Sequence, residues 1–180
     1  MLAFWNSGYE TTSIGDLTAA MGVTAPSLYA AFGNKQQLFF EAMRLYAGDL
    51  RLLEQAMNEA PSAQAAVAEM LRGAAVLYTG ETTPPGCLLA SAAATGSPEA
   101  AEVRAAIAAV RREIRDMIVR RIETDVANGT MSQSTPPGVL ADLAIAVTQG
   151  LSVLARDGAE RERLFALAEA AMHAWNVHRA

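Results

Sequence analysis

The sequence predicts an all-α fold built in two parts, and three observations lead to this prediction. Alanine supplies 38 of the 180 residues and 52% of the chain is apolar, a composition that favours packed helices over sheets. Apolar residues recur at steps of three and four along most of the chain, as on the buried face of a helix. Eight of the 11 aromatic residues fall within the first 46 positions, so we expect residues 1–46 and 47–180 to form domains with different cores.

Composition excludes several classes of protein. The single cysteine rules out an intrachain disulfide and any site built from several cysteines, and His173 and His178 are five positions apart, on different faces of a helix. The sequence has no phosphate loop, dinucleotide fingerprint or nucleophile elbow. We therefore expect no enzyme, no cofactor and no metal. The net charge of −5 argues against coating of nucleic acid by the whole surface.

Location is predicted from hydropathy. No apolar run is expected to approach the roughly 18 residues that span a bilayer, and the N-terminus lacks the features of a secretion signal. A lone cysteine also fits a reducing compartment. We therefore expect a cytoplasmic protein with no membrane partner.

The first 33 residues carry the signals of two short helices. Ser13 and Asp16 have the spacing of a capping box, which predicts a helix over 14–21 that ends at Gly22. A threonine and a first-turn proline predict a second helix over 25–32. This outline is typical of a helix-turn-helix, whose second helix enters the DNA major groove, and also of an ordinary helical hairpin. The expected shared core is Leu17, Met21, Val23, Leu28 and Phe32.

The rest of the chain is predicted to form longer helices. A connecting helix of roughly 34–58 joins the two parts, with apolar residues at three- to five-residue steps. Proline near the start or glycine near the end marks several of the later helices. These helices are expected at about 61–79, 86–95, 97–128, 137–156 and 159–178.

A longer pattern runs through the N-terminal part. It consists of Gly8-Tyr9-Glu10-Thr11-Thr12-Ser13-Ile14, Asp16-Leu17, Gly22-Val23-Thr24, Ser27-Leu28-Tyr29, Phe32, Lys35 and Leu38. In this order and spacing it resembles the DNA-binding domain of the TetR/AcrR (tetracycline-repressor-like) transcriptional regulators over residues 4–46. Beyond residue 60 the resemblance is architectural. It implies an N-terminal helix-turn-helix DNA-binding domain, a connecting helix, and a C-terminal helical domain that binds an effector and dimerises.

The resemblance implies two sets of DNA contacts. Base edges would be read from the start of the recognition helix, by Thr24, Ala25, Pro26 and Ser27. These small side chains offer hydroxyl hydrogen bonds and contacts with thymine methyls, but not the bidentate pairing of arginine with guanine. Phosphates would be contacted by Tyr29, Lys35 and Ser13. Core packing is the alternative role for Tyr29, and helix capping alone is the alternative for Ser13.

The N-terminal part departs from the family pattern in charge and in length. Residues 1–46 hold Lys35 and Arg44 against three acidic residues, whereas a DNA-binding protein gains much of its affinity from Lys and Arg at phosphates. Family members also have a longer first helix before the position of Phe4. We expect Met1 to be internal to the natural reading frame, or the chain to be truncated; a complete chain would bind DNA weakly.

The last two helices carry apolar residues at three-four spacing. Such seams resemble the four-helix dimer interface of the family, which implies a homodimer on a palindromic operator. Either seam alone is equally typical of an internal core. The seam residues proposed for the interface are Leu140, Val147, Leu151, Leu154, Leu164, Ala168, Ala171 and Trp175.

An effector pocket is expected among the helices of residues 61–156. Its predicted lining is Met70, Leu77, Tyr78, Cys87, Met117 and Gln149, each of which is also a typical core residue. Such a lining suits a largely apolar ligand with one or two polar anchors. Cys87 begins the predicted short helix, where it is either a sensor of electrophiles or a plain buried cysteine.

Taken together, these patterns predict a ligand-responsive transcriptional repressor. It would bind double-stranded operator DNA as a homodimer and be released by a small, largely apolar effector. The alternative is a dimeric small-molecule-binding or electrophile-sensing helical protein with impaired DNA binding.

Overall fold

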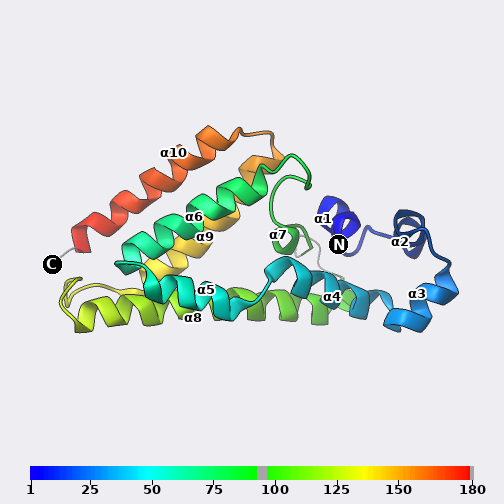
Figure 1. Ribbon diagram of the computed structural model, residues 1–180, viewed down its shortest axis with the longest axis horizontal. Helices are drawn as coiled ribbons and strands as arrows, with labels where there is room; N and C mark the ends of the chain where they lie inside the picture. The colour runs from blue at the N-terminus through cyan, green and yellow to red at the C-terminus, as the bar shows by residue number, and fades with distance from the viewer. Residues whose placement is uncertain (93–96, 179–180) are drawn as a thin grey trace. The chain divides into compact units, whose positions relative to one another are not determined.

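The computed structural model describes residues 1–92 and 97–178, and helices make up most of them (Figure 1). These described residues contain no β-strand, which confirms the predicted all-α fold. The chain divides into two compact units, one of Met1–Asp49 with Cys87–Ala109 and one of Leu50–Gly86 with Val110–Ala180. The first unit therefore includes a segment from the middle of the sequence.

The first unit surrounds a small aromatic core. Its elements are α1 (Leu2–Ser7), α2 (Ile14–Met21), α3 (Ala25–Phe32), α4 (Lys35–Ala47), α7 (Leu88–Ala92), η1 (Pro98–Ala100) and the start of α8 (Ala101–Ala127). Phe4, Trp5 and Phe39 are almost completely buried. The Phe4 and Phe39 rings meet edge to face with centroids 5.2 Å apart, a favourable aromatic geometry. These large rings fill a core that such short helices cannot fill with aliphatic side chains.

The helix-turn-helix has the predicted bounds, but its core is smaller than predicted. The capping box of Ser13 begins α2, and Gly22 ends it in the left-handed conformation with φ of 66°. Leu17 and Leu28 are buried, whereas Met21 is 45% exposed and Val23 is 38% exposed. The prediction that these last two residues join the core was wrong. Each of these eight-residue helices, α2 and α3, buries a single leucine, and the residues at the turn between them stay on the surface.

The single connecting helix predicted over 34–58 is two helices. Helix α4 ends at Ala47, and α5 (Leu50–Glu59) begins after a break at Gly48. Gly48 has φ of 66° and ψ of −159°, a conformation open to glycine and strongly unfavourable for other residues. The regular spacing of apolar residues on both sides of Gly48 concealed this break.

The second unit is a bundle of longer helices. Helices α6 (Ala63–Tyr78), α9 (Pro137–Arg156) and α10 (Arg161–Met172) pack against one another, and α5 packs on α6 (Figure 1). The unit also holds η2 (His173–His178) and α8 from Val110 onward. Helix α9 has the predicted bounds. Helix α7 begins at Leu88, two positions after the predicted start, and positions 93–95 of that prediction lie outside the described residues.

Helix α9 corrects the expectation about apolar runs. Over 20 residues it has a mean hydropathy of 1.7 in its most apolar stretch, so by length and composition it could cross a membrane. One such helix is weak evidence for a membrane span, because a core helix of a globular protein has the same properties. Here α9 packs against α6 and α10, and Leu140, Ala144 and Leu151 on it are buried.

A buried ion pair joins α8 to the turn between α5 and α6. Arg121 is 7% exposed and Asp125 is 1% exposed, and the two side chains form a salt bridge. The Arg121 guanidinium also donates to the backbone carbonyls of Met57 and Ala60, each at 3.0 Å. Asp125 accepts a hydrogen bond of 2.7 Å from the N–H of Ala63. The pair thus satisfies the last carbonyls of one helix and the first N–H of the next.

Candidate nucleic-acid interface

The predicted base-reading residues lie together at the start of α3. Thr24, Pro26 and Ser27 are exposed and Ala25 is half-buried. The Thr24 and Ser27 hydroxyl oxygens are 3.0 Å apart, and the Ser27 N–H donates to Thr24 Oγ1 at 3.4 Å. One hydroxyl hydrogen is used within this pair, so one hydroxyl hydrogen and the remaining lone pairs face outward for a partner. The surface that these four residues form is small and uncharged.

Tyr29 lies on the surface of α3 rather than in its core. Its side chain is 45% exposed, whereas the preceding Leu28 is 1% exposed. Core packing, the alternative role for Tyr29, therefore does not fit this position. The phenol keeps a hydroxyl that can donate to an acceptor such as a phosphate oxygen.

Lys35 is held in place by two groups that the sequence did not indicate. Its ammonium donates to the backbone carbonyl of Glu10 at 3.2 Å and lies 4.7 Å from the centre of the Tyr9 ring. Partial burial lowers the pKa of Lys35, while the nearby carboxylates of Glu10 and Asp16 raise it. Because Tyr9 and Glu10 precede Lys35 by about 25 positions, no local spacing could have revealed these contacts.

Ser13 is engaged in capping α2. Its hydroxyl donates to Asp16 Oδ2 at 2.7 Å and accepts from the Asp16 N–H at 3.1 Å. The Ser13 N–H also donates to Asp16 Oδ2, at 2.8 Å. These hydrogen bonds, first that of the Ser13 hydroxyl, lower the pKa of the Asp16 carboxyl. The capping role predicted for Ser13 is thus present, and a phosphate would have to compete with Asp16 for its hydroxyl.

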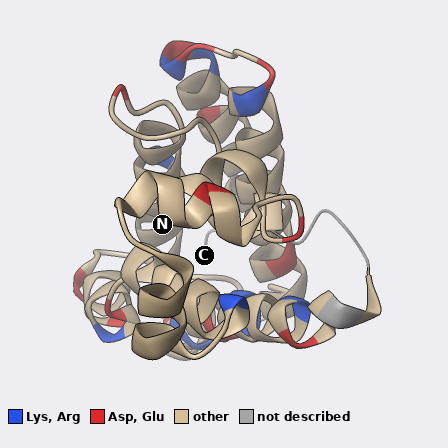
Figure 2. Ribbon diagram, turned by 90° about the vertical axis from the view of Figure 1, so that its right-hand side faces the viewer, with Lys and Arg blue, Asp and Glu red and all other residues tan. Residues whose placement is uncertain are grey.

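The interface carries little positive charge. Helix α3 has no charged residue, and Figure 2 shows the helix-turn-helix mostly in tan, the colour of uncharged positions. Of the two cations in residues 1–46, Arg44 forms an exposed salt bridge with Glu41 and Lys35 is the half-buried residue described above. Residues 1–46 can therefore neutralise few phosphates.

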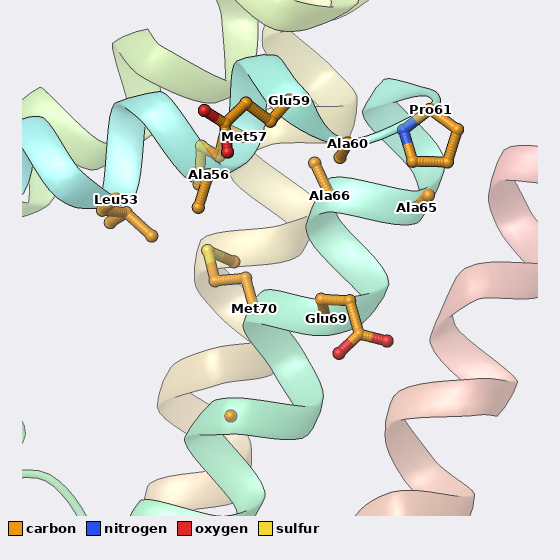
Figure 3. Close-up of a pocket in the computed structure, with 11 residues that line it drawn as sticks. Leu53, Ala56, Met57, Glu59, Ala60, Pro61, Ala65, Ala66, Glu69 and Met70 are labelled. Atoms are coloured by element: carbon orange, nitrogen blue, oxygen red, sulfur yellow. The ribbon is translucent and has the colours of Figure 1, made fainter.

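A cavity of about 630 Å³ lies in the second unit between α5 and α6 (Figure 3). Met70, one of the six residues predicted to line a pocket, lines this cavity together with Leu53 and Met57. The other five are not among its lining residues. Leu77 is 41% exposed, Gln149 is half-buried, Tyr78 and Met117 are buried, and Cys87 is buried in the first unit.

Most residues of the predicted dimer seam are buried within the chain itself. Five of its residues are at most 3% exposed, namely Leu140, Leu151, Leu164, Ala168 and Trp175, and the other three are half-buried. The prediction therefore selected the core face of α9 and α10, because a three-four repeat describes an internal contact equally well. The exposed large apolar residues on these helices are Val139, Val153 and Leu167.

Within residues 1–92 and 97–178, no group of three His, Cys, Asp or Glu side chains is arranged to hold a metal ion.

Comparison with known families identifies the chain. Residues 3–42 match the family of bacterial regulatory proteins of the tetR family, and residues 63–175 match the tetracyclin repressor-like C-terminal domain. The chain belongs to the TetR family. As a TetR-family protein it is a DNA-binding regulator of transcription, and the resemblance of residues 4–46 is confirmed and extends to the C-terminal helices.

Individual TetR-family relatives align along nearly the whole chain. The HTH-type transcriptional repressor ComR of Escherichia coli (strain K12) is 30% identical over 181 residues, which cover 97% of this chain and 84% of ComR. The repressor BdcR of the same organism is 30% identical over 168 residues, covering 92% of this chain and 79% of BdcR. Both of these TetR-family relatives are transcriptional repressors by name.

A solved TetR-family structure has the same fold. It is a cysteine mutant of the regulator CifR, complexed with 26-bp double-strand operator DNA. It superposes with a TM-score of 0.90 at 42% sequence identity, covering 97% of this chain and 92% of the CifR chain.

Proposed function

We propose that this TetR-family protein is a ligand-responsive repressor that binds operator DNA as a homodimer and leaves it when an effector binds. The observation that carries the proposal is helix α3 of the helix-turn-helix, which is capped by Thr24 and has the exposed Ser27 in its first turn. Repression is supported by the names of ComR and BdcR, and operator binding by the CifR complex. A cytoplasmic location follows from this function.

In this proposal, base reading and phosphate binding are performed by different residues. Thr24, Ala25, Pro26 and Ser27 contact base edges, and their methyl and hydroxyl groups favour thymine methyls over bidentate guanine contacts. Tyr29 and Lys35 contact phosphates and fix the register of α3 on the duplex. Ser13 contributes mainly as a cap.

The proposed dimer uses the exposed face of α9 and α10. Val139 is 65% exposed, Val153 is 56% exposed and Leu167 is 38% exposed, and the exposed Ala146 and Gly150 allow close approach of a second helix. Exposed apolar residues on two neighbouring helices favour self-association. Two-fold symmetry would place two α3 helices on half-sites of a palindrome about one DNA turn apart, roughly 34 Å.

The proposed effector site is the cavity between α5 and α6. Its apolar walls suit a small, largely apolar molecule. A coupling free energy of about 1–3 kcal/mol between effector and DNA would change operator occupancy 5- to 150-fold.

A mobility-shift assay on the DNA that flanks the protein's own gene tests this proposal. We expect specific binding at physiological salt, and we expect Tyr29→Phe to weaken binding to all sequences alike. Ser27→Ala should instead change the preferred bases, because it alters a base-reading hydroxyl. If Tyr29→Phe and Ser27→Ala both lowered DNA affinity equally on every sequence, the proposed division between phosphate-contacting and base-reading residues would be wrong.

One observation favours an alternative function. Residues 1–46 contain only two cations, and one of them is paired with Glu41, so a dimeric small-molecule-binding protein with weak DNA binding is the second candidate. Sensing of electrophiles is disfavoured, because Cys87 is only 5% exposed. Absence of specific DNA binding in the mobility-shift assay, with effector binding retained, would support this alternative.

A further inference from the structure

We propose that Glu10 is a positioning residue for DNA binding, which sets the place of Lys35 through a hydrogen bond to the segment before α8. This inference rests on the proposed function, in which Lys35 contacts a phosphate, and adds the residue on which that contact depends. It follows from the two bonds of Glu10, from the packing of its loop, and from a second bond between the starts of α4 and α8.

Glu10 is bound through both its backbone and its side chain. Its backbone carbonyl accepts a hydrogen bond from the Lys35 ammonium at 3.2 Å. Its carboxylate oxygen Oε1 accepts a hydrogen bond of 3.1 Å from the N–H of Ser97, which lies directly before η1 and α8. All three residues are half-buried. Glu10 therefore connects the only lysine of the chain to a residue 87 positions after Glu10 itself.

The loop that carries Glu10 is packed against other parts of the first unit. Gly8 has φ of 83°, and a Cβ atom there would meet the carbonyl oxygen of Ser91 at 3.1 Å, so the loop lies close against α7. The Tyr9 ring meets Phe39 edge to face, with ring centroids 5.2 Å apart. The carbonyl of Glu10 and the ring of Tyr9 thus form a fixed surface under the lysine ammonium.

A second hydrogen bond joins the starts of α4 and α8. Gln36, the second residue of α4, donates from Nε2 to Glu102 Oε2 at 2.6 Å, in the first turn of α8. The guanidinium of Arg104 donates to the Ser97 carbonyl at 2.6 Å, which holds Ser97 from the side of α8. The partner of Glu10 is therefore itself fixed in place.

The hydrogen bond and the charge of Glu10 have opposite effects on DNA binding. A lysine that is already placed loses less side-chain freedom on binding a phosphate, so the bond that fixes its loop strengthens the contact. The carboxylate itself weakens DNA binding, because it adds negative charge close to the proposed phosphate contact. Substitutions that remove one effect at a time can separate the two.

Two pairs of variants isolate the hydrogen bond. Glu10→Gln and Glu10→Ala both remove the charge, but glutamine keeps an oxygen that can accept from Ser97. Ser97→Pro removes the N–H donor and suits the backbone there, because Ser97 has φ of −66°. Ser97→Ala is its control, since both variants lose the hydroxyl that accepts from the Ala100 N–H and only alanine keeps the donor.

The position of Lys35 can be measured without DNA. Isotope-labelled lysine gives the NMR signals of Lys35 alone, because the chain has no other lysine. Its ammonium lies over the Tyr9 ring, 4.7 Å from the ring centre, so the ring current should shift the neighbouring Cε protons upfield. We expect this shift in the unmodified protein, Glu10→Gln and Ser97→Ala. Glu10→Ala and Ser97→Pro should lose most of it.

Fluorescence anisotropy on a scrambled duplex measures the effect on phosphate binding. Affinity should fall about threefold or more from Glu10→Gln to Glu10→Ala, and by a similar factor from Ser97→Ala to Ser97→Pro. Both differences should vanish in a Lys35→Ala background, because the two residues act through Lys35. The same two substitutions at the exposed Glu41 are the control and should give equal affinities.

Three results would overturn the inference: a Lys35 signal that does not move in Glu10→Ala and Ser97→Pro, equal DNA affinities within both pairs, or differences that persist in the Lys35→Ala background. Circular dichroism checks the fold of each variant. If Glu10→Ala or Ser97→Pro fails to fold, the other variant and its control decide.

Failure of the proposed function gives a different result. If Lys35→Ala leaves DNA affinity unchanged while the NMR signal moves as expected, Glu10 places Lys35 but the phosphate contact is wrong. If operator and scrambled duplexes bind equally while both pairs of variants differ as expected, the sequence-specific repressor is disproved and the positioning role of Glu10 stands.

Discussion

Lys35, which we propose as a phosphate contact, is already held in place within the free protein. Its ammonium already rests on the carbonyl of Glu10 and the ring of Tyr9, so little side-chain freedom remains to be lost on binding a phosphate. Its type and position were predictable from the sequence pattern, but its anchoring was not, because the anchor comes from the loop between α1 and α2.

Replacing Lys35 tests its phosphate role. Lys35→Ala should weaken binding to operator and scrambled DNA to a similar degree, and the slope of log affinity against log salt should fall by about one. Fluorescence anisotropy over a salt series measures this slope. Arg44→Ala, which removes an exposed and already paired cation, is the control. A slope that stays the same in Lys35→Ala would mean that Lys35 contacts no phosphate.

The cap of α2 leads to a prediction about pH. Hydrogen bonds from Ser13 lower the pKa of Asp16 below its ordinary value of 3.8 in the folded state. The stability from this bond is therefore present above the unfolded pKa and is lost as pH falls through the lower, folded pKa. Asp16→Asn should lower Tm at pH 7 and should make a smaller difference near pH 3. If Asp16→Asn lowered Tm by the same amount at pH 7 and near pH 3, the ionised Asp16 cap would not be the cause.

At the scale of elements, local signals were predictable and distant contacts were not. The capping box at Ser13, the left-handed Gly22 and the first-turn proline of α3 each act within a few residues, and each gave a correct helix boundary. Gly48 is the exception among local signals, because periodicity over its flanks outweighed one glycine. The seams of α9 and α10 were recognised correctly as apolar, but spacing cannot tell a core from an interface.

The burial of the Arg121 and Asp125 pair was likewise not predictable from local spacing. The two residues are four positions apart on α8, a spacing typical of exposed helix pairs, but here both are buried and bond to a turn some 60 residues earlier in the chain. The pair therefore ties together elements that are remote in sequence.

Breaking this pair should cost much more than breaking an exposed one. Arg121→Leu should lower the free energy of unfolding by about 3–5 kcal/mol, because it leaves Asp125 buried without its cation. Arg120→Leu breaks a pair with Glu54 whose side chains are 56% and 40% exposed, and should cost at most about 1 kcal/mol. Urea unfolding of both variants measures the difference. Similar losses would show that the pair contributes no more than a surface bridge.

At the scale of the whole molecule, the proposed homodimer would compensate for the low charge of the helix-turn-helix. One α3 helix with small neutral side chains offers few base contacts, and two such helices on a palindrome double them. The exposed apolar residues of α9 and α10 supply a surface for that pairing.

Charge placed on this surface should separate the subunits. Val153→Glu with Leu167→Glu should give a monomer by light scattering at micromolar concentration, because each chain would bury two carboxylates in an apolar interface. Leu45→Glu, at a 72% exposed position on α4, should remain dimeric. A double variant that stays dimeric would place the interface on another face.

Specific binding of operator DNA is the central claim, and one titration tests it most directly. Fluorescence anisotropy at physiological salt compares the DNA flanking the protein's own gene with a scrambled duplex of the same length and composition. We predict that the flanking DNA binds at least about a thousandfold more tightly than the scrambled duplex. Equal affinities for the two duplexes would contradict the claim that α3 reads a sequence.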